Sequence, residues 1–110
     1  MNLEFNKNED EMKLLVSQMK QRHAQVSLGG GKKAMEKNKA RGKMAPRERI
    51  QYLIDKGSTF TEIGSFTGWD MYEEHGGCPS GGTVAGIGYV KGRQCIIVAN
   101  DNTVKAGAWF

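Results

Sequence analysis

Cysteine and proline are scarce in this sequence, which has two of each among 110 residues. Cys78 and Cys95 stand alone, because neither has a second cysteine two residues away. This spacing indicates neither a zinc ribbon nor a disulfide framework. We therefore expect no metal site and two reduced thiols.

Long apolar runs are missing as well. The opening segment, MNLEFNKNEDEMK, carries acidic residues and no apolar core. That composition excludes a secretory signal and an arginine-rich transit peptide. No stretch is long enough to span a bilayer. We expect a soluble, cytoplasmic protein without membrane contact, and the length suits one small domain.

Positive charge is concentrated in one part of the chain. The formal net charge is +4, and residues 20–49, called the basic segment here, contain only Glu36 and Glu48 as acidic residues. The basic residues of this segment are Lys20, Arg22, Lys32, Lys33, Lys37, Lys39, Arg41, Lys43, Arg47 and Arg49. Such a segment attracts any polyanion. One hypothesis is therefore a small nucleic-acid-binding module, although the segment holds no aromatic side chain for base stacking.

The amino-terminal half of the sequence predicts helices. Asn8 is a suitable cap for a first helix that runs to about Ser27, where three glycines follow. Its apolar residues recur at helical spacing and predict one buried face that His23 continues. These residues are Met12, Leu15, Val16, Met19 and Val26.

Two shorter helices are expected next. One covers Lys32 to Ala40, and another begins at Pro46, presents Ile50, Leu53 and Ile54 on one side, and stops at Gly57. The helical period is lost after Gly57. We therefore divide the chain into a helical arm, residues 1–57, and a β region, residues 58–110.

The β region predicts a short strand at Phe60 to Ile63, a long loop over residues 68–82, and a hairpin. The hairpin strands are Thr83 to Val90 and Gln94 to Asn100, joined by residues 91–93. Residues 95–99, CIIVA, are apolar without alternation, which is typical of a strand inside a layered fold. Little of this chain remains to cover the second face, so we expect poor stability in isolation.

The segment VANDNTVKAGAWF, residues 98–110, has two interpretations. It is either a core strand that enters a turn at Asn100 to Asn102, or one wall of a ligand groove. In the groove, the small residues Ala106, Gly107 and Ala108 would let a ligand approach the main chain, and free N–H groups would bind anionic oxygen.

Other candidate groups carry less information. Arg41, Lys43, Arg47 and Arg49 are suited to phosphate contacts. His23 lies on an apolar stripe and His75 lacks a positioned partner, so neither is assigned as a general base. The acidic residues near His75 match no metal-ligand spacing, and GGTVAGIG lies within a β pattern and is not a dinucleotide fingerprint. We assign no catalytic residue.

Two blocks carry a family resemblance: LGGGKKAMEKNKARGKMAPRERIQYLIDKGSTFTEIGSFTGWDMY and PSGGTVAGIGYVKGRQCIIVANDNTVKAG. In this order they are similar to the amino-terminal region of carboxyltransferase (β) subunits of biotin-dependent acyl-CoA carboxylases. The resemblance covers residues 28–110. It is nearest to the methylcrotonoyl-CoA carboxylase type, with the propionyl-CoA type next. The cysteines of the bacterial acetyl-CoA carboxylase β subunit, which bind zinc, are absent.

The resemblance implies an α+β, crotonase-like fold, of which this chain holds the amino-terminal part. Family members move a carboxyl group from carboxybiotin, carried by a biotin carboxylase or biotin carrier partner, to an acyl-CoA, and they form homo-oligomers. The residues that match the CoA-binding loop are Val104, Lys105, Ala106 and Gly107, with Lys105 as the best phosphate contact. From the charge of the basic segment, we add Arg41 and Lys43 as CoA-binding candidates. Relatives commonly have a glycine pair and a threonine where this chain has Ala106, Gly107 and Ala108. The oxyanion-hole segments lie further along the family chain, so we expect no catalysis by this chain alone.

Overall fold

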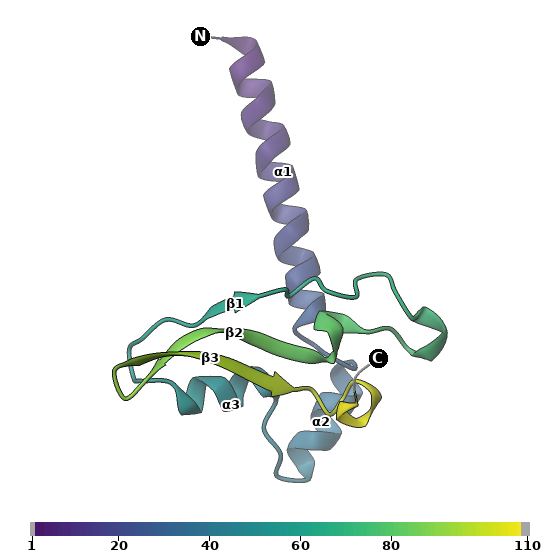
Figure 1. The fold of residues 1–110 in the computed structure, drawn as a ribbon. Helices are drawn as coiled ribbons and strands as arrows, with labels where there is room; N and C mark the ends of the chain where they lie inside the picture. Colours follow the sequence, from purple (N-terminus) through teal and green to yellow (C-terminus); the bar gives the residue numbers. More distant parts are fainter. Residues whose placement is uncertain (1, 109–110) are drawn as a thin grey trace.

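The computed structural model describes residues 2–108, an arrangement of three α-helices and a three-stranded antiparallel sheet (Figure 1). The helices are α1 (Leu3–Val26), α2 (Lys32–Ala40) and α3 (Pro46–Leu53), and the strands are β1 (Thr61–Ile63), β2 (Thr83–Val90) and β3 (Arg93–Asn100). Three short 3₁₀ turns complete the fold: η1 (Glu73–His75), η2 (Pro79–Gly82) and η3 (Lys105–Gly107). The predicted α+β class, helices followed by strands, is confirmed. Among residues 2–108, no helix combines the length and the apolar character that crossing a bilayer requires.

Helix α1 projects away from the rest of the molecule (Figure 1). Asn2 caps it, because its side-chain oxygen accepts a hydrogen bond of 3.0 Å from the Glu4 N–H. The predicted start at Asn8 was therefore wrong. The predicted buried face was also wrong for this chain: Leu15 is 59% exposed and Met19 is 51% exposed. Only its last turns meet the body, through Arg22 over the Trp69 ring, the His23 ring against Phe66, and buried Val26.

Helices α2 and α3 agree more closely with the sequence. Helix α2 has the predicted bounds, and α3 begins at Pro46 as expected. It ends at Leu53 and not at Gly57, because the backbone of Ile54 is already extended (φ −72°, ψ 159°). Ile50 and Ile54 are buried, whereas Leu53 points to solvent and is 52% exposed.

The sheet has the order β1-β2-β3. Strand β1 pairs Thr61 with Ile87, and β2 pairs Thr83 with Asn100 at one end of β3. The predicted hairpin is confirmed, but its loop is shorter than expected, because Arg93 already belongs to β3. The loop residues Lys91 and Gly92 both have positive φ (50° and 76°), as a two-residue type I′ turn requires.

Asp55 anchors this hairpin turn to the end of α3. Its carboxylate accepts hydrogen bonds from the Lys91 N–H (2.6 Å) and the Gly92 N–H (2.7 Å), and its own N–H donates to the Tyr89 carbonyl at 2.8 Å. Each turn N–H therefore has a charged acceptor, which makes these bonds stronger than neutral ones.

The core lies between α3 and one face of the sheet. Its buried side chains are Ile50, Ile54, Val84, Ile97 and Ala99, with Phe60, Val90 and Cys95 packed against them. Gly86 makes room for Phe60, since a Cβ there would lie 2.6 Å from the Phe60 ring.

The other face of the sheet is uncovered. Ile96 is 83% exposed and Val98 is 56% exposed, although their neighbours Ile97 and Ala99 are buried. The sequence predicted an apolar second face without cover in this chain, and the structure confirms it. Strands of this composition are normally buried on both faces.

Candidate functional site

The candidate site is the loop that follows β3, residues 101–107. Asp101 is buried, with 3% of its surface exposed. Its Oδ1 accepts from both the Thr103 N–H (2.9 Å) and the Thr103 hydroxyl (2.5 Å). The Val104 N–H donates to the Asp101 carbonyl at 3.1 Å. The predicted turn is therefore present, but it spans Asp101 to Val104 and begins one residue later than expected.

Segments from the amino-terminal half hold this loop in place. The Gly30 N–H donates to Thr103 Oγ1 at 2.9 Å, and Asn38 Nδ2 donates to Asn102 Oδ1 at 2.7 Å. Helix α2 accordingly lies beside the loop in Figure 1. The Arg49 guanidinium also donates to the Asn100 carbonyl. Three separate amino-terminal segments thus fix one short loop.

The glycines that follow α1 are required for this contact. A Cβ on Gly29 would lie 2.3 Å from Asp101 Oδ2, and one on Gly30 would lie 1.9 Å from the Thr103 carbonyl oxygen. Any side chain at either position would push the loop away.

The predicted CoA-binding residues form a tight left-handed turn. Val104 is buried, and φ is 47° at Lys105, 53° at Ala106 and 86° at Gly107. Left-handed backbone costs a non-glycine residue about 1–2 kcal/mol, and such strain concentrates at ligand-binding sites.

Two donors of this turn are already used. The Gly107 N–H donates to the Val104 carbonyl and the Ala108 N–H to the Lys105 carbonyl, both at 3.0 Å. The expectation of free N–H groups at these two positions is therefore wrong. Lys105, which is exposed, is the one basic residue within the turn at residues 104–107.

Lys105 also influences the neighbouring loop, residues 68–82. Burial raises the pKa of the Cys78 thiol, and the positive charge of Lys105 partly opposes that rise. Both cysteines are free thiols. A Cβ on Gly82 would lie 3.6 Å from Val104. The long loop and the turn at residues 104–107 are thus direct neighbours.

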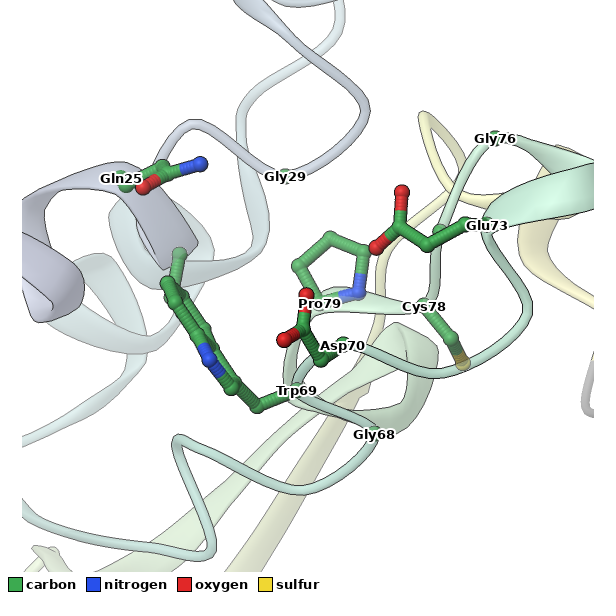
Figure 2. Close-up of a pocket in the computed structure, with 11 residues that line it drawn as sticks. Gln25, Gly29, Gly68, Trp69, Asp70, Glu73, Gly76, Cys78 and Pro79 are labelled. Carbon is green, nitrogen blue, oxygen red and sulfur yellow. The ribbon is translucent and has the colours of Figure 1, made fainter.

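A pocket of about 180 Å³ lies between the end of α1 and the same long loop. Figure 2 shows Asp70 and Glu73 on one side of it, Trp69 and Gln25 on the other, and the Cys78 sulfur directed away. Because two carboxylates line this pocket, it is poorly suited to a phosphate or another anion.

The four basic residues predicted as phosphate contacts fall into two groups. Arg47 forms a bidentate pair with Glu62 (2.6 and 3.1 Å) and reaches Ser80 Oγ at 3.4 Å, while Arg49 bonds to the main chain of Asn100. These two arginines have structural roles. Arg41 and Lys43 are exposed just beyond α2, and the Lys43 N–H bonds to the carbonyl of Asn38 at 3.0 Å.

The histidines do not form an acid–base pair with the loop. His23 Nε2 lies 3.8 Å from Glu62 Oε2, and its ring contacts Phe66 edge-on at 6.1 Å. His75 lies 3.8 Å from Glu74. Neither is placed with the residues of the candidate site.

Sequence reasoning missed the residues that position the loop: Gly30, Asn38, Asp101, Asn102 and Thr103. One local signal was available, because an Asp followed two residues later by Thr favours a side-chain-stabilised turn. The contacts of Gly30 and Asn38 had no such signal, since their partners lie 73 and 64 residues away.

A family model described as "Carboxyl transferase domain" matches residues 37–110. Among curated proteins, the probable methylcrotonoyl-CoA carboxylase beta chain of Drosophila melanogaster is 45% identical over 97% of this chain. The biotin-dependent 3-methylcrotonyl-coenzyme A carboxylase beta1 subunit of Mycobacterium tuberculosis is 43% identical over 92% of this chain. The chain spans 18% and 19% of the lengths of these two relatives.

Solved structures agree with these sequence matches. The beta subunit of geranyl-CoA carboxylase from P. aeruginosa superimposes with a TM-score of 0.78 at 33% identity, over 96% of this chain and 19% of that one. A transcarboxylase 12S structure, described as a hexamer with hydrolysed methylmalonyl-coenzyme A bound, also gives a TM-score of 0.78, at 31% identity. It covers 88% of this chain and 20% of its own length.

Proposed function

The chain belongs to the carboxyl transferase domain family, and we propose that it forms the first part of the acyl-CoA-binding domain of a biotin-dependent acyl-CoA carboxylase. In that enzyme, a carboxyl group would pass from carboxybiotin to an acyl-CoA of the methylcrotonoyl or propionyl kind. The crotonase-like fold expected from the sequence agrees with the solved relatives, which are carboxyltransferase subunits.

The observation that carries the proposal is the braced, left-handed turn at Val104 to Gly107 with Lys105 on it. A CoA molecule has several phosphate charges, and a lysine ammonium binds phosphate as a point charge. A turn held by Thr103 and Asp101 would present that charge at a fixed place, so the turn loses little conformational entropy when the ligand binds.

The role of this part of the protein is binding and not proton transfer. Carboxylation at a carbon beside a thioester proceeds through an enolate, which preorganised N–H donors stabilise. We propose that this chain holds the CoA portion through Val104, Lys105, Ala106 and Gly107. Arg41 and Lys43 would add to the electrostatic attraction.

Biotin itself does not fit the pocket of Figure 2. A carboxylated biotin is an anion, and the pocket is lined by the carboxylates of Asp70 and Glu73. We assign no biotin contact to this chain. A relative is named as biotin-dependent, and in our proposal the biotin would be carried by a partner subunit or domain.

Two finer points belong to the same proposal. The helical arm, residues 1–57, and the β elements of residues 58–110 would join further chain in a homo-oligomer.

The cytoplasmic location stays a prediction, because the Drosophila melanogaster relative is named as mitochondrial.

The nucleic-acid hypothesis has lost its support. The charge of Arg47 is balanced by Glu62, and the Arg49 guanidinium is held by the Asn100 carbonyl, so neither arginine is a free phosphate contact. The relatives named above are acyl-CoA carboxylase or transcarboxylase subunits.

The proposal can be tested by ¹⁵N NMR of the 110-residue chain titrated with CoA. We expect shift changes at the amides of Val104 to Gly107, because amide shifts report even millimolar binding. Lys105→Ala should weaken the binding about tenfold, the effect of losing one partly desolvated charged contact.

Lys91→Ala is the matched control, since Lys91 also has positive φ but lies in the hairpin turn at the opposite end of β3 (Figure 1). It should leave CoA binding unchanged. The proposal is wrong if 10 mM CoA shifts no amide resonance of residues 101–108. It is also wrong if duplex DNA shifts the same amide resonances as strongly as CoA does.

A further inference from the structure

Helix α1 carries an apolar stripe that nothing in residues 2–108 covers. Met12, Leu15, Val16 and Met19 share one face, because they follow the i, i+3, i+4, i+7 spacing. All four are exposed. Figure 1 shows why: the first part of the helix leaves the body, and no other segment runs beside it there.

A bare helix of this kind needs a partner. In proteins, most of the stability of a helix comes from packing of its apolar face and less from helix propensity. The stripe also has cavities beside it, one of which lies between Leu15, Met19, Phe66 and Trp69. The structure thus provides an apolar helix face that is available for a partner.

The charges along α1 indicate what the partner is. The first half, residues 3–14, holds four acidic residues and two lysines, a net charge of −2, whereas the second half, residues 15–26, holds Lys20 and Arg22 and no acidic residue. The helix therefore has opposite charge at its two ends. An identical helix running in the opposite direction would present the complementary charges.

The positions of two charges around the helix fit this arrangement closely. Glu9 and Lys20 are 11 residues apart, which is about three helical turns, so they flank the apolar stripe on the same side. In an antiparallel pair that crosses at the helix midpoint, Glu9 would face the partner's Lys20, and the contact would occur twice. In a parallel pair, Glu9 of one copy and Lys20 of the other would lie on opposite flanks of the interface, so this contact could not form.

We propose that α1 is an interface with a second copy of this chain, in which the two α1 helices pack antiparallel through Met12, Leu15, Val16 and Met19. The contact is isologous, as expected around a two-fold axis. Glu9 and Lys20 set the orientation. This proposal concerns assembly and does not depend on CoA binding.

The first experiment is sedimentation equilibrium of the 110-residue chain over a range of concentrations, with Leu15→Asp and Leu14→Asp compared. Both leucines are exposed to a similar degree, 59% and 61%, but only Leu15 lies on the stripe. We expect a dimer that Leu15→Asp weakens more than tenfold and that Leu14→Asp leaves intact.

The second experiment tests the orientation. Glu9→Lys and Lys20→Glu should each weaken the dimer about tenfold, because each turns two attractions into repulsions. The double variant with both substitutions should recover the affinity, since the charges are then exchanged and still opposite. Asp10→Lys changes the net charge as Glu9→Lys does, but on the far side of the helix, and should have little effect.

Three results would overturn the proposal. The first is a monomer at every concentration, which would mean that another segment or protein covers the stripe. The second is a dimer that survives Leu15→Asp, which would place the contact elsewhere, for example on the exposed sheet face. The third is a double variant whose dimer is as weak as the dimers of the two single variants, which would exclude the antiparallel pairing.

Discussion

Gly30 and Thr103 are joined by a hydrogen bond of 2.9 Å, although 73 residues separate them in the sequence. The same Thr103 hydroxyl donates to the buried Asp101 carboxylate. Thr103 therefore links the turn after α1 to the loop that follows β3. Its side chain connects the helical arm with the residues proposed to bind CoA.

Thr103→Val removes this link while keeping the side-chain shape. The Gly30 N–H loses its acceptor and buried Asp101 loses a donor, so we expect a loss of about 1–3 kcal/mol in the free energy of unfolding. Thr103→Ser, which keeps the hydroxyl, should lose much less. Urea denaturation measures both, and hydrogen exchange at the Gly30 amide should be faster only in the valine variant. Equal stability of the two variants would show that the hydroxyl has no such role.

Ile96 and Ile97 are adjacent but face opposite sides of β3. Ile97→Ala should destabilise the chain by about 2–4 kcal/mol, because it opens a cavity against α3. Ile96→Ala should change stability by less than about 0.5 kcal/mol and reduce aggregation, because it removes exposed apolar surface. Thermal unfolding and light scattering distinguish the two effects. A large loss of stability from Ile96→Ala would mean that the second face is covered in solution.

The poor stability expected of this chain follows from the same surface and remains a prediction. A calorimetric scan of the 110-residue chain should show a broad, weakly cooperative transition. A sharp transition from a monomer would contradict it.

Arg47 and Glu62 provide a partly buried ion pair, with 25% and 16% of their side chains exposed. In a double-mutant cycle with Arg47→Met and Glu62→Gln, we expect a coupling energy of about 1–2 kcal/mol, because the contact is bidentate and shielded from water. The exposed pair Lys13–Glu9, at 3.2 Å, is the matched control and should couple by no more than about 0.5 kcal/mol. Equal coupling in the two pairs would contradict this difference.

Cys78 should react with iodoacetamide only at alkaline pH, because burial raises its pKa and the thiolate is the reactive form. Lys105 lowers that pKa, so Lys105→Ala should raise it further and move the onset of alkylation to higher pH. Lys91→Ala should have no effect. Mass spectrometry of a Cys95→Ser background measures the rate at Cys78 alone. An onset that moves to lower pH in Lys105→Ala would show that the charge does not act on this thiol.

Local patterns predicted the hairpin and two of the three helices well. Strand β2 has the expected bounds, because its residues favour extended backbone and Gly92 marks the turn. Pro46 correctly marked the start of α3. The start of α1 was missed because Asn2 and Asn8 are both good caps, and the earlier one is used.

Contacts over long separations were not predictable from local patterns. Helical spacing identified the apolar face of α1, but periodicity does not say whether the covering surface belongs to the same chain. Arg47 was predicted as a phosphate contact from its charge. Its pairing with Glu62, from β1, depends on how α3 packs against the sheet, which no local pattern specifies.

The hydrogen bonds from the Lys91–Gly92 turn to the Asp55 carboxylate also determine the register in which β3 pairs with β2. A slip of one residue would turn Ile96 and Val98 inward and Ile97 and Ala99 outward. Both pairs are apolar, so hydrophobic burial hardly distinguishes the native alignment from the shifted one. The two hydrogen bonds from the turn to Asp55 hold only when Lys91 and Gly92 form the bend. A single carboxylate, outside the sheet, thus selects which side of an ambiguous strand becomes the core.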